Sequence, residues 1–153
     1  MFRIDFTTHA FIDDGEYHPN AKITLEDYTE YIEIDTTEWS DDIFRAQWKS
    51  ALTVFFDHKR NNCTLLVSQF TPERGFGLEA WIVFRRSDGN NDGLSVQNKL
   101  FFANRLRKYK TLNDFLDRKE KQETITREGE KISEWKVTEK DLRKWLSDLN
   151  KIS

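Results

Sequence analysis

Residues 41–58 read DDIFRAQWKSALTVFFDH, and this stretch decides the fold because its periodicity is helical. Large apolar side chains recur at the spacing of one helix face, at Phe44, Trp48, Leu52 and Phe55. Ser40 stands before the stretch as a helix N-cap, and Asp41 and Asp42 place negative charge beside the unpaired amides of the first turn. We therefore predict a core helix near 41–58.

Strand signals follow this helix in three runs, which are CTLLVSQF at 63–70, LEAWIVFRR at 78–86 and LSVQNKLFF at 94–102. Pro72 and Gly75 separate the first two runs, and the turn residues DGNNDG at 88–93 separate the last two. Short connections between neighbouring strands favour hairpins. An antiparallel meander of three strands is the simplest interpretation.

Elements at both ends of the chain complete the predicted fold. Period-2 alternation predicts a strand at 2–6, and ITLEDYTEYIEID at 23–35 predicts one or two more, with Glu33 and Asp35 facing away from Ile32 and Ile34. Towards the C-terminus we expect a short helix capped by Thr111, a strand ISEWKV at 132–137, and a helix near 139–149 with an apolar stripe at Leu142, Trp145, Leu146 and Leu149.

The predicted class is therefore α+β, an antiparallel β-sheet of about five to seven strands packed by the helix near 41–58 and the C-terminal helix near 139–149. The 153 residues fit one domain, 1–153, because domains most often contain about 100–150 residues. The apolar stripes of the helices, with Trp48 and Trp145, and the strand tryptophans Trp81 and Trp135 are expected in its core. Trp39 is then the tryptophan expected at the surface.

Motifs for chemistry are missing from the sequence. The three histidines, His9, His18 and His58, lack the partners of a zinc site, and the few glycines form neither a P-loop nor a GxGxxG element. The single cysteine, Cys63, lies in an apolar run and is expected to be a buried thiol in a reducing compartment. We expect no enzyme activity, metal, cofactor or small-molecule ligand, and without a signal peptide or apolar span we expect a cytoplasmic protein away from membranes.

Charge divides unevenly along the chain. Residues 1–45 contain 12 acidic and three basic side chains, whereas residues 46–153 contain 15 acidic and 21 basic ones. Such a division is typical of an acidic face that attracts a basic partner, and equally of a solvated surface. The alternative function is a nucleic-acid-binding regulator that uses the basic segment 105–121, with its bases at Arg105, Arg107, Lys108, Lys110, Arg118, Lys119 and Lys121. The overall pI of about 5.7 disfavours it, and a hydrolase without a recognisable motif is a third possibility.

About two thirds of the chain resembles a known family, the immunity proteins of bacterial contact-dependent growth inhibition systems. The resemblance is carried by Trp39, FRAQWKSAL at 44–52, CTLLVSQF at 63–70, Trp81, VQNKLFF at 96–102 and KISEWKVTEKDLRKWL at 131–146. None of these segments is a catalytic motif.

The resemblance implies a protein that binds and neutralises the cognate C-terminal toxin domain of an exported effector, in a 1:1 complex that blocks the toxin's active or substrate-binding surface. Such toxins are often nucleases, whose substrate-binding surfaces are basic, and an acidic immunity surface would complement them. From the acidic N-terminal third we expect the toxin-binding residues to be Asp13, Asp14, Glu16, Glu26, Tyr31, Glu33, Asp35, Glu38 and Trp39. Trp39 and Tyr31 are the expected anchors, and the acidic residues are expected to speed association.

Overall fold

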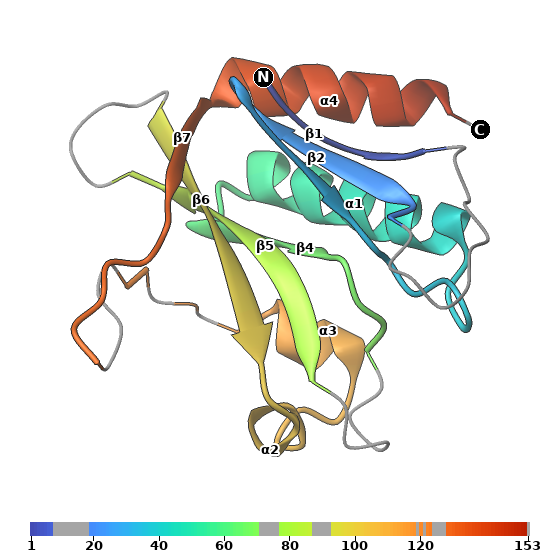
Figure 1. Cartoon of the computed structure of the whole chain (residues 1–153), viewed down its shortest axis with the longest axis vertical. Coiled ribbons are helices and arrows are strands. Elements are labelled where there is room, and N and C mark those ends of the chain that lie inside the picture. The colour runs from blue at the N-terminus through green and yellow to red at the C-terminus, as the bar shows by residue number, and fades with distance from the viewer. Residues whose placement is uncertain are drawn as a thin grey trace.

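The computed structural model describes residues 1–7, 19–70, 77–86, 93–118, 120, 122–123 and 128–152 (Figure 1). Its elements, in chain order, are β1 (Phe2–Phe6), β2 (Ala21–Leu25), β3 (Tyr28–Ile32), α1 (Asp41–Asp57), β4 (Asn62–Leu66), β5 (Leu78–Arg85), β6 (Gly93–Phe101), α2 (Ala103–Leu106), α3 (Leu112–Leu116), β7 (Trp135–Thr138) and α4 (Glu139–Lys151). The predicted α+β class is confirmed.

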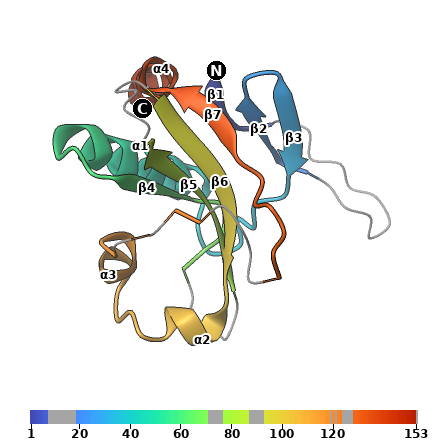
Figure 2. The ribbon, with the colours of Figure 1, turned by 90° about the vertical axis from the view of Figure 1, so that its left-hand side faces the viewer.

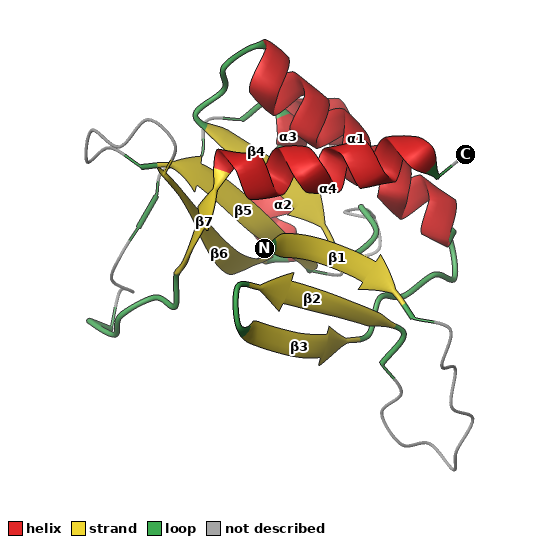
Figure 3. Cartoon of the chain, turned by 90° about the horizontal axis from the view of Figure 1, so that it is seen from above, coloured by secondary structure: helices red, strands yellow, loops and turns green. Residues whose placement is uncertain are grey.

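The described strands form two sheets, whereas the sequence pattern predicts one. The N-terminal sheet has the order β1-β2-β3 and the second sheet has the order β4-β5-β6-β7, with antiparallel neighbours throughout. Helix α1 packs beside β4 and α4 beside β1, and the two helices contact each other. Figure 3 shows this helix pair next to both sheets, so that helices rather than strand hydrogen bonds join them.

Both predicted long helices form where the capping residues place their starts. The Ser40 side chain accepts a hydrogen bond from the backbone of Ile43, and α1 ends at Asp57, one residue before the predicted end. Thr138 and Asp141 form a complete capping box, and α4 extends to Lys151 rather than 149. None of the helices in the described ranges has both the length and the apolar character needed to cross a membrane.

The second sheet buries apolar side chains on both faces. One face meets the N-terminal sheet, α1 and α4, with Trp48, Trp81 and Trp145 at the centre of that cluster. The opposite face is covered by α2 and α3 through Leu106 and Phe115. Figure 2 shows α2 and α3 well away from β1–β3. The central strands are therefore buried on both sides, which explains the nearly continuous apolar run in β5.

Helix α1 also covers the outer edge of β4. The Gln47 side chain donates to Thr64 O at 2.9 Å and accepts from Leu66 N at 2.9 Å, while Trp48 Nε1 donates to Leu66 O at 2.7 Å. These contacts satisfy backbone groups that an edge strand would otherwise expose. The QW pair within FRAQWKSAL therefore has a structural role.

Candidate functional site

The most acidic stretch of the chain lies at the surface. We define the acidic segment as residues 26–42, which include β3, its preceding turn, the link to α1 and the first turn of α1. It contains eight carboxylates and no Lys or Arg, namely Glu26, Asp27, Glu30, Glu33, Asp35, Glu38, Asp41 and Asp42. All are exposed except Asp41, which is partly buried. Figure 2 shows β3 at the outer edge of the molecule.

Alternation along the acidic segment separates its apolar from its charged residues. Ile32 and Ile34 are buried, whereas Glu33 and Asp35 are exposed, as predicted. The Asn20 side chain donates to Ile34 O at 2.8 Å and accepts from Ile34 N at 2.7 Å. This amide holds the chain extended past the end of β3, so that Glu33 and Asp35 continue to point outward.

Local hydrogen bonds shape the link between β3 and α1. Asp35 accepts from the backbone and hydroxyl of Thr37, and these two bonds lower the pKa of the Asp35 carboxyl and favour its charged form. Gln69 Oε1 then accepts from Glu38 N at 2.5 Å and from Trp39 N at 2.6 Å. The link is therefore tied to the chain after β4.

The carboxylates of the turn and of β3 differ in their surroundings. Glu26 has a backbone φ of 55°, and its side chain accepts from the Met1 ammonium at 2.8 Å. This pairing partly neutralises Glu26. Glu33 has no ion-pair partner among the described residues, so its charge faces solvent. Asp13, Asp14 and Glu16, which the sequence also indicated, lie outside the described residues.

The two predicted aromatic anchors differ in accessibility. Tyr31 is 58% exposed on the outer side of β3 and fits the expectation of an accessible ring. Trp39 is half-buried, with its ring 5.4 Å from that of Phe44, and it packs against both apolar clusters. Trp39 is therefore only partly at the surface, where the sequence predicted it, because the indole occupies the junction between the two clusters.

A cleft of about 470 Å³ begins at Trp39 and lies between α1, β4 and α3. Its lining includes Trp39, Ile43, Ala46, Ser50, Leu112 and Leu116. Arg60 and Asp117, also in the lining, form an ion pair of 3.5 Å. Nothing in the sequence brings residues 39–64 and 112–117 together, so the cleft could not be predicted from local patterns.

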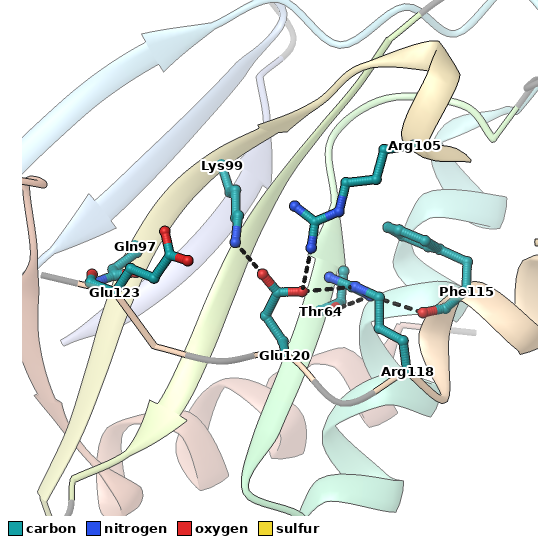
Figure 4. Close-up of polar contacts among 8 residues, drawn as sticks. All are labelled: Thr64, Gln97, Lys99, Arg105, Phe115, Arg118, Glu120 and Glu123. Atoms are coloured by element: carbon teal, nitrogen blue, oxygen red, sulfur yellow. Dashed lines mark hydrogen bonds and ion pairs between the residues drawn. The ribbon is translucent and has the colours of Figure 1, made fainter. Parts of the chain in front are cut away.

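Two arginines of the basic segment 105–121, Arg105 and Arg118, form ion pairs within the protein (Figure 4). The Glu120 side chain is 1% exposed and pairs with Lys99, with Arg118 Nε at 2.9 Å and with Arg105 Nη2 at 3.7 Å. Burial acts to raise the pKa of Glu120, but the Lys99 hydrogen bond and the neighbouring cations outweigh burial and lower it. We call this group the Glu120 cluster.

The Glu120 cluster changes the interpretation of the basic segment. The Arg118 side chain is only 4% exposed, and it donates from Nη1 to Phe115 O at 2.8 Å while lying over the rings of Phe101 and Phe115. Arg118 is therefore part of the protein interior and not of a solvated basic face. Arg107, Lys108 and Lys110 are exposed, and Lys119 and Lys121 lie outside the described residues.

The described residues offer little for catalysis or metal binding. No group of three or more His, Cys, Asp or Glu side chains in the described ranges could hold a metal ion. Cys63 is buried, as predicted, and burial raises the pKa of its thiol, which opposes formation of the reactive thiolate. The site that remains is a surface of charge and apolar groups suited to binding.

Both the sequence and the fold of the chain are similar to those of known proteins. A family model described as the CdiI N-terminal domain matches residues 34–145. The immunity protein CdiI of Enterobacter cloacae subsp. cloacae is 24% identical over 124 residues, which are 80% of this chain and 80% of that protein. A chain of a solved CdiA-CT/CdiI toxin and immunity complex from Enterobacter cloacae has the same fold, with a TM-score of 0.79 at 22% identity over 99% of both chains.

Proposed function

Because the chain belongs to the CdiI N-terminal domain family, we propose that it is the immunity protein of a contact-dependent growth inhibition system. It binds the cognate C-terminal toxin domain of the effector in a 1:1 complex and neutralises it by covering its active or substrate-binding surface. The family match confirms the resemblance that the segments from Trp39 to 146 carried. The relative from Enterobacter cloacae is itself an immunity protein.

The acidic segment is the observation that supports this mode of action. Residues 26–42 contain eight carboxylates and no Lys or Arg. The Met1 ammonium pairs with Glu26 and Arg45 pairs with Asp42, and the other six carboxylates leave the segment with a net negative charge around β3 and the link to α1. A basic toxin surface is attracted to such a charge, which raises the rate of association and selects the partner. Glu33 and Asp35 make the strongest candidates because both point outward and belong to a segment that the Asn20 and Gln69 side chains hold in place.

The negative surface further favours a nuclease as the toxin. A nuclease must bind phosphates, so its substrate surface concentrates Lys and Arg. Carboxylates that occupy this surface exclude the nucleic acid without any reaction. The protein itself therefore needs no catalytic residues, and it acts in the cytoplasm, where the toxin would meet its substrate.

Co-expression with the toxin domain encoded immediately upstream tests the proposed function. We expect the two proteins to copurify in equal amounts, and we expect cells that produce this chain to survive production of the toxin domain. A matched culture with an unrelated immunity protein should not survive. Separate elution of the two proteins together with unprotected growth would contradict the proposal.

The Glu120 cluster weighs against the alternative nucleic-acid regulator. Arg105 and Arg118 pair with Glu120, so two of the cations that would have contacted phosphates already have a carboxylate partner. Titration with tRNA at moderate salt provides the direct comparison. We expect no salt-sensitive complex, and a complex that disappears when Arg105, Arg107 and Lys108 are neutralised would instead support the regulator.

A further inference from the structure

We propose that the cleft between α1 and α3 receives an apolar anchor side chain of the toxin domain, next to a Lys or Arg that pairs with the acidic segment. This inference rests on the proposed function and adds a second contact of different chemistry. The volume of about 470 Å³ falls within the range of about 300–1,000 Å³ that is usual for binding pockets. One large side chain and its neighbours can fit there.

The side of the cleft formed by α1 includes several small side chains. Ala46, Ser50 and Ala51 line it together with the larger residues Ile43 and Val54. Ile43 is 46% exposed although it borders this apolar surface. An apolar group placed between α1 and α3 would remove the Ile43 side chain from water, which is favourable in proportion to the area covered.

Three of the polar side chains that line the cleft have partners within the protein. The Gln47 amide is used by the β4 backbone, and Arg60 and Asp117 pair with each other. Cys63 is buried, and burial keeps its thiol neutral. The cleft therefore offers an incoming group mainly contact surface, which suits an apolar side chain better than a charged one.

The acidic segment continues directly into the cleft and defines the partner's chemistry. Trp39 and Ile43 line the cleft, and between and beside them in the chain stand Glu38, Asp41 and Asp42. A segment with an apolar residue beside a basic one complements both features at once. Two copies of this chain that met symmetrically through the cleft would bring their two acidic segments together, and the repulsion between like charges opposes that arrangement.

The two contacts affect different rate constants. Charges that steer an encounter act mainly on the association rate, whereas a desolvated anchor in a pocket acts mainly on the dissociation rate. Filling the cleft should therefore shorten the lifetime of the complex without slowing its formation. This separation makes the cleft testable independently of the acidic segment.

The test uses the full chain and the toxin domain encoded immediately upstream, with rates measured by biolayer interferometry. Ala46→Phe and, separately, Ser50→Leu add bulk to residues that line the cleft and are themselves exposed, so we expect both variants to fold. Thr53→Phe adds a similar ring to an exposed position of α1 outside the cleft and serves as the control. Thermal unfolding of each variant checks folding.

We expect Ala46→Phe and Ser50→Leu to raise the dissociation rate at least about tenfold while changing the association rate less than about twofold. Thr53→Phe should leave both rates unchanged. Folded variants of Ala46 and Ser50 that dissociate as slowly as the unmodified chain would overturn the cleft proposal and leave the proposed function intact. Failure of the unmodified chain to bind this toxin domain would instead contradict the proposed function.

Discussion

The buried Glu120 carboxylate connects several elements of the protein. It pairs with Lys99 of β6, Arg105 of α2 and Arg118, which follows α3. These ion pairs connect the second sheet to the two short helices on its outer face. Arg118 in turn donates to Phe115 O at the end of α3. Because Leu112 and Leu116 of α3 line the cleft, Glu120 indirectly positions one wall of the proposed anchor site.

Glu120→Gln is expected to destabilise the fold by about 3–5 kcal/mol at pH 7, because it leaves buried Arg118 and its neighbours without their counter-charge. The folded-state pKa of Glu120 is lowered from 4.5, so the stabilisation is present above that pH and is lost as the pH falls through the folded-state pKa. Urea unfolding from pH 7 to pH 3 measures both effects. The difference in free energy of unfolding between the unmodified chain and Glu120→Gln should shrink towards pH 3.

Glu123→Gln is the matched control for this measurement. Glu123 is exposed and lies three positions further along, and only its backbone oxygen is used, by Gln97. We expect Glu123→Gln to change the free energy of unfolding by no more than about 0.5 kcal/mol. Equal losses of unfolding free energy for Glu120→Gln and Glu123→Gln would show that the Glu120 carboxylate does not stabilise the buried cations.

At the scale of elements, the outer edges of β3 and β4 differ in how they are covered. The β4 edge is covered by Gln47 and Trp48 of α1, whereas no described strand pairs with the outer edge of β3. The acidic segment begins in the turn before β3 and ends in the first turn of α1. The element proposed for recognition thus includes a strand edge that no other described strand covers.

Glu33→Lys is expected to slow association with the toxin domain by about tenfold at low salt, because it replaces an outward negative charge by a positive one. Asp57→Lys makes the same charge change at the exposed end of α1, outside the acidic segment, and should have a much smaller effect. Stopped-flow mixing measures both rates. Equal slowing by the two variants would assign the effect to net charge rather than to the acidic segment. Glu33 is preferred to Asp35 because Asp35 also holds the Thr37 turn.

At the scale of the whole molecule, local patterns predicted the elements well and their assembly less well. Helix α1, the β4-β5-β6 meander and α4 follow from periodicity and caps that lie within short stretches of sequence. The division into two sheets, the position of Trp39 and the burial of Arg118 depend on contacts between distant parts of the chain. Arg118 and Thr64, for example, are 54 positions apart. Composition alone cannot distinguish such a buried base from a solvated one.

The uneven charge predicts a strong ionic-strength dependence for the unmodified chain. The net charge is only −3, but 12 of the 27 acidic side chains lie in residues 1–45, so the molecule presents different potentials to a partner in different orientations. Salt shortens the screening length from about 30 Å at 0.01 M to about 8 Å at 0.15 M. We expect the association rate to fall at least tenfold over that range. A rate independent of salt would contradict electrostatic steering.

The edge of β3 that no described strand pairs with also matters before any partner arrives. An inhibitor has to be held in stock ahead of the threat, and an open strand edge invites identical molecules to add to one another into aggregates. Two copies that approached through β3 would bring Glu26, Asp27, Glu30 and Glu33 against the same carboxylates. The charges proposed to attract a foreign surface therefore also keep the waiting molecules apart, and the cell can store the inhibitor without losing it to self-association.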